Sequence, residues 1–115
     1  MIDFACKRFD LKEIIKCSLG LTKSELEIMD FFIKNYGDEF SSIKVSEQTG
    51  FQLSTVQKAL KKLYSQKVIL RSQKNLENGG YVFFYRCNSK QDIRKIIKDI
   101  IRGWSEKVEK EIDRL

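Results

Sequence analysis

Hydrophobic residues recur every three or four positions in several stretches of the chain, which is the spacing of one face of a helix. A short helix is predicted over 10–20, between a cap at Asp10 and a stop at Gly20. A second helix follows the capping box that Thr22 and Glu25 form, and its apolar spacing continues to Gly37. The positions predicted to face the core in this second helix are Leu26, Met29, Phe32 or Ile33, and Tyr36.

A helix-turn-helix unit is predicted in the middle of the chain. Residues 40–43 form a short strand or an extended lead-in, and a brief helix over about 44–49 ends at Gly50. A second helix begins at Gln52 or Leu53 and continues to Gln66. Two helices joined by a few residues around a glycine form this unit. The apolar stripe of the second helix is Leu53, Val56, Leu60 and Leu63.

The period then changes to that of strands. Residues 68–75 and 81–87 are rich in β-branched, apolar and aromatic side chains, and Glu77-Asn-Gly-Gly80 separates them. Asn-Gly between two such runs is a strong hairpin signal. A hairpin directly after the second helix makes the unit a winged helix-turn-helix. Tyr81, Phe83 and Tyr85 alternate and could form a base-stacking platform, but we favour a sheet face packed on the helices.

The last element is a helix from a cap at Ser89 to the end of the chain, about 40 Å long at the α-helical rise. Its apolar stripe continues well past what a small core can cover, and exposed contiguous apolar surface usually marks an interface. We therefore predict a homodimer joined by this helix and the first one. The alternative is that the helix folds back and buries Trp104 in its own protomer. The predicted interface residues are Leu11, Ile14, Ile15, Ile97, Ile100, Ile101, Trp104, Val108, Ile112 and Leu115.

The fold class predicted from these elements is mainly α with a small β-hairpin (α+β). The 115 residues, 42% of them hydrophobic, are sufficient for one domain with a modest core. We expect a single winged helix-turn-helix domain over 1–115, with its core in 21–87 and dimerisation helices in 10–19 and 89–115. The chain has neither an apolar run of membrane-spanning length nor a signal-peptide pattern, so a soluble cytoplasmic protein without membrane contacts is expected.

The net charge of +6 is concentrated in one segment. Between Gln48 and Leu76 there are six basic residues and no acidic one, whereas the rest of the chain holds 16 of each sign. Such a segment is typical of a surface that binds a polyanion, because neutralised phosphates supply affinity that does not depend on sequence. A basic run alone is more often a solvated face, so the predicted helix-turn-helix and wing decide the interpretation in favour of DNA.

The second helix of the unit is predicted to enter the major groove, and the wing over 68–87 to contact the flanking backbone or minor groove. Gln can pair with adenine, Lys can donate to guanine or phosphate, and Ser and Thr can bond phosphate. A basic wing residue suits the minor groove, and Arg71 is the best single candidate. The candidate contacts to double-stranded DNA are Gln52, Ser54, Thr55, Gln57, Lys58, Lys61, Lys62, Arg71, Lys74 and Asn78.

Catalysis and metal binding find no support in the residues. The chain has no histidine, no nucleophile–base pair and no glycine-rich phosphate loop, so we predict a protein that is not an enzyme, with no cofactor and no metal site. Cys6, Cys17 and Cys87 are interpreted as free thiols; the alternative is a redox sensor at Cys6 or Cys17. The rival function is a winged-helix adaptor that binds proteins within transcription machinery. The concentrated positive charge argues against it.

The segment from Thr49 to Leu63, followed by Val68-Ile-Leu-Arg71, resembles the winged-helix core of the MarR and TrmB-like transcriptional regulators of archaea and bacteria. The resemblance covers about 21–87 closely. It implies a sequence-specific regulator, of the archaeal type without a separate effector domain, that dimerises through its terminal helices on a near-palindromic operator. MarR-like proteins bind small aromatic effectors, but no residue here indicates an effector.

Two positions depart from the family pattern. Gln52 stands where the family usually has a Ser that caps the recognition helix, so a weaker cap is expected. Lys67 stands where the family often has Gly, so a left-handed conformation is expected at this lysine.

Overall fold

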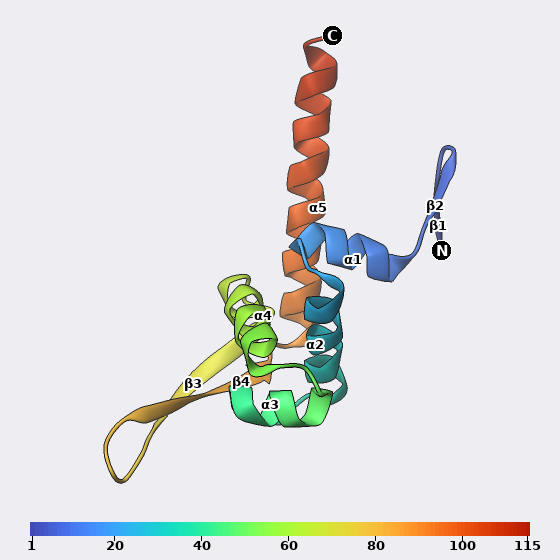
Figure 1. Ribbon diagram of the computed structural model, residues 1–115. Helices are drawn as coiled ribbons and strands as arrows, with labels where there is room; N and C mark the ends of the chain where they lie inside the picture. The colour runs from blue at the N-terminus through green and yellow to red at the C-terminus, as the bar shows by residue number, and fades with distance from the viewer.

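The helical patterns of the sequence form five helices in the computed structural model, which describes residues 1–115. Two antiparallel hairpins accompany them, so the α+β class and the winged helix-turn-helix architecture are confirmed (Figure 1). The helices are α1 (Leu11–Leu19), α2 (Lys23–Lys34), α3 (Ser42–Thr49), α4 (Leu53–Ser65) and α5 (Lys90–Asp113). The strands are β1 (Ile2–Phe4), β2 (Lys7–Phe9), β3 (Ile69–Asn75) and β4 (Tyr81–Cys87).

The predicted caps set most helix boundaries. The Asp10 side chain accepts from the Lys12 N–H to begin α1, and both halves of the Thr22–Glu25 capping box begin α2. The expectation that α2 continues to Gly37 is wrong. It ends at Lys34 with Asn35 as the C-cap, whose backbone N–H and side-chain amide both donate to the Phe31 carbonyl, at 3.1 and 2.8 Å. Tyr36 therefore lies outside the helix and is 55% exposed, not in the core.

The core lies where α2, α3, α4 and the base of β3 meet. In the apolar stripe of α4, Val56, Leu60 and Leu63 are buried, but Leu53 is 39% exposed. Ala59, which the stripe did not include, is fully buried. Leu53 is the first residue of α4 and lies at the end of the packed helix, whereas Ala59 lies in its middle. The fully buried large side chains are Leu19, Ile28, Phe32, Val45, Val56, Leu60, Leu63, Val68 and Ile69.

The wing is the β3–β4 hairpin, which extends away from the helices (Figure 1). Its register runs from Ile69 opposite Cys87 to Asn75 opposite Tyr81. Phe40 forms a single bridge to Tyr85 through hydrogen bonds of 2.9 and 2.8 Å, so Phe40 and Ser41 are an extended lead-in and not a strand. Ser42 and Ile43 already belong to α3, which begins two residues earlier than expected. The expected packing of the alternating aromatics on the helices holds for Tyr85, which touches the core cluster, but not for Tyr81, which is exposed near the tip.

The turn between α4 and β3 has the left-handed residue expected from the sequence. Lys67 has φ of 64°, a conformation that costs a residue with a Cβ some strain. The buried side chain of Asn88 donates to the Lys67 carbonyl at 2.9 Å and accepts from the Ser89 N–H at 2.7 Å. This asparagine ties the start of the wing to the start of α5.

Helix α5 packs on the core only at its N-terminal end. Ile93 is buried, and Ile96, Ile97 and Ile100 pack against the core cluster. Beyond these residues the helix stands free of the rest of the protomer (Figure 1). The expected alternative, a helix folded back over Trp104, is not observed, because Trp104 is 64% exposed.

The N-terminal hairpin β1–β2 was not predicted. It projects from α1 on the side opposite the wing (Figure 1), and its apolar side chains Ile2 and Phe4 are exposed. Its turn holds Ala5 in a left-handed conformation with φ of 52°. Alanine at such a position gives no turn signal, since sequence patterns rely on Gly, Asn or Asp there.

Candidate nucleic-acid interface

The outer face of α4 carries the polar residues that the sequence predicts for groove contacts. Ser54, Gln57, Lys58 and Lys61 are all exposed, and Thr55 is half-buried. None of these side chains has an ion-pair partner within the protomer. Gln52 caps the helix in extended conformation but makes no side-chain hydrogen bond, which confirms the weaker cap. The N-terminal N–H groups of α4 therefore stay available to an anion.

On the wing, the guanidinium of Arg71 lies over two aromatic rings. Its guanidinium carbon lies 4.2 Å from the ring centre of Tyr64 on α4 and 4.1 Å from that of Phe83 on β4. Such stacking fixes a planar guanidinium while its N–H groups remain free to donate. Arg71 is thereby placed beside the last turn of α4, at the junction of helix and wing. No local pattern in the sequence indicates the part that Tyr64 has in this arrangement.

Further along the wing, Lys74 has a charge that is already paired. Its ammonium lies 3.2 Å from the Glu39 carboxylate and 4.3 Å from the centre of the Phe84 ring. Asn78 lies in the exposed turn at the tip. Lys74 can still reach a phosphate, but only in exchange for an existing ion pair.

Lys62 is placed differently from the expectation. Its ammonium donates to the Gly20 carbonyl and to the Glu25 carboxylate, the latter at 3.3 Å, so it faces α2 and not the free side of α4. The reason is the helical period: Lys62 adjoins the buried Leu63 and lies on the flank of α4 next to α2. Its charge serves the protomer's own fold, and we leave it out of the proposed DNA surface.

Glu25, the ion-pair partner of Lys62, is a buried acid. Burial by itself would raise the pKa of Glu25, but the Thr22 N–H donates to the carboxylate at 2.8 Å and Lys62 adds a charged hydrogen bond. Together these interactions hold the pKa of Glu25 below its usual value of 4.5. The ionised carboxylate thus joins the start of α2 to α4 and the α1–α2 turn.

Lys62→Met is expected to lower the free energy of unfolding at pH 7 by about 1–2 kcal/mol, measured by urea denaturation. Removing one partner of a fully buried pair costs more, about 3–5 kcal/mol, but the Lys62 side chain is 37% exposed and solvent can replace part of the interaction. DNA affinity is expected to change little. An affinity loss without a stability loss would contradict this placement.

The pH dependence of stability provides the second measurement on this pair. The folded-state pKa of Glu25 is depressed, so the stabilisation is fully present above the unfolded-state pKa and is lost as pH falls through the folded-state pKa. The stability difference between wild type and Glu25→Gln is therefore expected to shrink on acidification from pH 7 to below 4. A difference independent of pH would show that the carboxylate charge is not what stabilises the fold.

The residues predicted for the dimer interface divide into two groups. Ile15, Ile97 and Ile100 pack against the core of their own protomer, and Ile14 is half-buried on α1. The others are exposed on α5 and at the start of α1: Leu11, Ile101, Trp104, Val108, Ile112 and Leu115.

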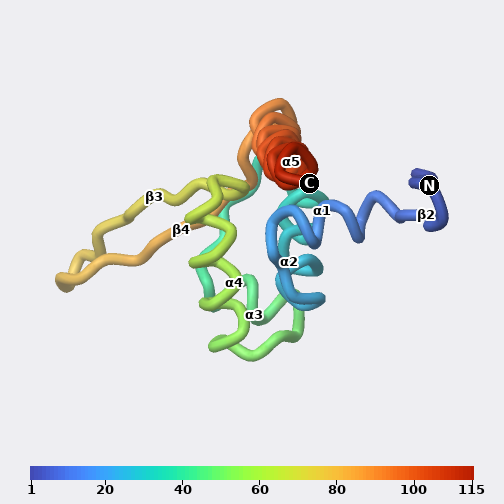
Figure 2. Tube along the Cα trace, turned by 90° about the horizontal axis from the view of Figure 1, so that it is seen from above, coloured from blue at the N-terminus to red at the C-terminus, as the bar shows by residue number.

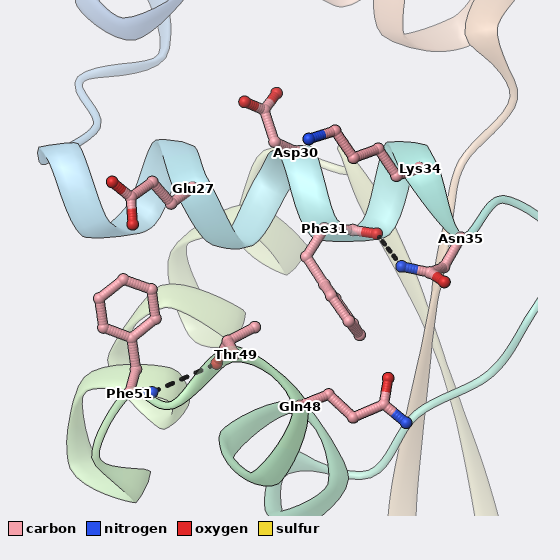
Figure 3. Close-up of a pocket in the computed structure, with 8 residues that line it drawn as sticks. All are labelled: Glu27, Asp30, Phe31, Lys34, Asn35, Gln48, Thr49 and Phe51. Atoms are coloured by element: carbon pink, nitrogen blue, oxygen red, sulfur yellow. Dashed lines mark hydrogen bonds between the residues drawn. The ribbon is translucent and has the colours of Figure 1, made fainter.

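A shallow depression of about 300 Å³ lies between α2 and the turn from α3 to α4 (Figure 3). Glu27, Asp30 and Lys34 line its α2 side, and Gln48 and Thr49 its α3 side. None of the predicted DNA-contact residues lines it. The acids and cysteines of the chain form no group that could hold a metal ion.

The three cysteines are free thiols and lie apart. Cys6 and Cys17 are exposed, on the N-terminal hairpin and on α1, whereas Cys87 is buried at the base of the wing. Burial raises the pKa of the Cys87 thiol, although nearby Lys90 partly lowers it, so this thiol stays protonated at neutral pH. No helix of the protein has the length and apolarity to span a membrane.

A recognition-type helix, a wing and a flanking long helix define the chain as a winged helix-turn-helix protein. The model of the DnaD N-terminal domain family matches residues 9–109, and the chain belongs to this family. An uncharacterized protein of Methanocaldococcus jannaschii is 30% identical over 104 residues, which cover 90% of this chain and 84% of that protein.

Solved structures share the fold. A possible transcriptional regulator from Methanosarcina mazei superposes with a TM-score of 0.92 at 39% identity, over 99% of this chain and 95% of that one. A point mutant of MepR from Staphylococcus aureus, bound to an oligodeoxyribonucleotide, gives 0.55 at 12% identity, over 91% and 73% of the two chains. MarR of the same organism, in complex with salicylate and kanamycin, gives 0.52 at 18% identity, over 88% and 65%. The last two likenesses show the fold alone.

Proposed function

We propose that this protein is a sequence-specific regulator of transcription that binds double-stranded DNA as a homodimer. Helix α4 enters the major groove, and the wing contacts the flanking backbone or minor groove. The observation that carries the proposal is the α4–wing surface, defined here as Lys58, Lys61 and Arg71 with the polar residues Ser54 and Gln57. Its three cations have no acidic partner in the protomer. The Tyr64 and Phe83 rings hold the Arg71 guanidinium in place, with its N–H groups free to contact DNA.

The fold supports this reading of the surface. In helix-turn-helix proteins the second helix lies in the major groove with its N-terminal residues at the base edges. Ser54, Thr55, Gln57 and Lys58 occupy those positions on α4. A solved neighbour with the same fold is bound to an oligodeoxyribonucleotide, and another is described as a possible transcriptional regulator. The finer assignment to a MarR- or TrmB-like type remains a prediction from residues 49–63 and the start of the wing.

In vitro selection of bound duplexes from a random pool tests the proposal. A palindromic consensus is expected, because two copies of α4 related by a two-fold axis read the same half-site in opposite directions. The rival, an adaptor that binds only protein, predicts that no duplex is enriched and that no shift occurs on random DNA at low salt.

Gln57→Ala separates base reading from backbone contact. The substitution is expected to relax preference at one operator position by about 1–3 kcal/mol and to leave affinity for random DNA nearly unchanged, because a Gln–adenine pair reads only one base. The measurement is fluorescence anisotropy on the selected operator, on single-position variants of it and on a random duplex.

Lys58→Ala is the matched comparison on the same helix, and it is expected to weaken all these duplexes alike, because a lysine on phosphate does not read sequence. If both variants changed specificity in the same way, the groove-facing side of α4 would be assigned wrongly.

A further inference from the structure

The proximal half of α5 carries a second positively charged face. Lys90, Arg94, Lys98 and Arg102 follow one another at intervals of four residues, so they form a stripe about 18 Å long on one side of the helix. All four side chains are exposed, and Lys95 lies beside them. We call the four stripe residues the α5 basic stripe.

This stripe points away from the protomer's own core. The opposite side of the helix carries Ile93, Ile96 and Ile100, which pack on the core. Seen along the axis of α5, helices α1, α2 and α4 all lie to one side of it, and the other side is open (Figure 2). The α4–wing surface therefore does not include this stripe.

The charges of the stripe are placed against the preferences of an isolated helix. Like charges four residues apart repel, and the stripe contains such neighbours in succession. Cations in the first turns also oppose the positive end of the helix dipole. Within the stripe only Arg102 has an acidic partner, Asp99, at 4.0 Å and with both side chains exposed. In 105–115 the two signs are interspersed, and Glu111 pairs with Arg114 at 3.2 Å. A bound polyanion would relieve the repulsion that is concentrated in the proximal half.

The chemistry of the surface selects the kind of polyanion. The shallow depression along the stripe is lined by Gln91, Arg94, Lys95, Lys98, Asp99 and Arg102, with no hydrophobic residue. Protein–protein interfaces draw most of their affinity from buried apolar and aromatic anchors, which this face lacks. The cations are also spread along the helix and do not converge on one point, as a small phosphate ligand would require. A regularly charged polymer fits both features.

We propose that the α5 basic stripe is a second, sequence-independent contact surface for the phosphate backbone of duplex DNA, separate from the α4–wing surface. It does not require α4 to read bases, so it goes beyond the function proposed above. The stripe adds affinity that does not depend on the DNA sequence, because it contacts phosphates outside the half-site that α4 reads. This added affinity falls steeply as the salt concentration rises.

The test is the variant Lys90→Gln/Arg94→Gln/Lys98→Gln/Arg102→Gln, measured by anisotropy on a random-sequence duplex several helical turns long, at KCl from about 50 to 200 mM. Glutamine has nearly the helix propensity of lysine and arginine, so α5 is retained, and circular dichroism checks this. Affinity at the lowest salt is expected to fall by about tenfold or more. The log–log salt slope is expected to become shallower by up to about 3.6 for each protomer bound, at about 0.9 for each of the four contacts.

The control removes the three cations of the distal half of the same helix, as Lys107→Gln/Lys110→Gln/Arg114→Gln, and is expected to keep most of the wild-type affinity and slope. Equal losses per charge removed in the two variants would overturn the proposal, because net charge alone would then explain them. An unchanged slope in the stripe variant would overturn it as well.

A third variant, Lys58→Ala/Lys61→Ala, keeps this inference distinguishable from the proposed function. If the Lys58→Ala/Lys61→Ala variant loses binding while the stripe variant does not, the stripe proposal fails and the α4–wing surface stands. If only the stripe variant loses binding, the stripe stands and the groove assignment of α4 fails.

Discussion

Cutting the chain after Ile101 is expected to yield a folded monomer that has lost most of its affinity for the operator. The cut removes Trp104, Val108, Ile112 and Leu115, which are exposed on one stripe of α5, and keeps the isoleucines that pack on the core. A contiguous apolar stripe of this length on a free helix is costly in water, and a two-fold copy of the same helix can cover it.

The expected loss of affinity follows from linking two half-sites. A dimer held through α5 presents two copies of α4 to successive major grooves, about 34 Å apart, so the second contact forms within one complex. Losing that linkage is expected to cost about 10²–10⁴-fold in operator affinity. Light scattering reports the mass, anisotropy the affinity, and thermal unfolding the integrity of the core.

A point variant guards against an effect of truncation on folding. Trp104→Glu places a charge in the middle of the stripe and is expected to give the same monomer, with a core as stable as that of wild type. Lys107→Glu, which adds negative charge in the same turns of the helix, serves as the control and is expected to remain dimeric. A truncated chain that stays dimeric and binds its operator normally would disprove the α5 interface.

The second large effect is expected from Lys58→Ala/Lys61→Ala/Arg71→Ala, which should abolish operator binding at physiological salt. In a dimer these residues neutralise about six phosphates, which gives a log–log salt slope near −5 from this surface alone, and each lost contact removes about 0.9 of it. The triple variant is therefore expected to lose at least about a thousandfold in affinity at low salt and to show a much shallower slope.

The control is Lys23→Ala/Lys34→Ala/Lys107→Ala, which changes the net charge equally at exposed positions outside the α4–wing surface. It is expected to bind the operator nearly as wild type does. If the two triple variants lost affinity equally, overall charge and not this surface would drive binding. A wild-type slope shallower than about −2 would show that the α4–wing surface is not the surface that contacts the phosphates.

The sequence by itself determined the order and type of most elements, because their signals are local. Capping at Asp10, Thr22 and Ser89, the glycine after α3, and the Asn-Gly turn of the wing each depend on a few neighbouring residues, and all occur where the sequence predicts them. The local signals failed where a helix end or a turn is made without glycine. Asn35 ends α2 early, and Ala5 makes a turn with no glycine.

The candidate site divides in the same way. The acid-free basic segment and the outward polar residues of α4 can be found from charge and period alone. Only the tertiary structure decides which of these cations lack an acidic partner. Lys62 pairs with Glu25 of α2, and Lys74 pairs with Glu39. Both partners lie far away in the sequence, and nothing local indicates them.

The tertiary structure also decided how much of the predicted dimer surface is available. The helical period places Ile97, Ile100 and Trp104 on one stripe, but it cannot show where the core ends. Ile97 and Ile100 pack against the protomer's own core, whereas Trp104 is left exposed. Periodicity identifies a helix face that avoids water, whereas what covers each turn of that face depends on elements brought together only by folding.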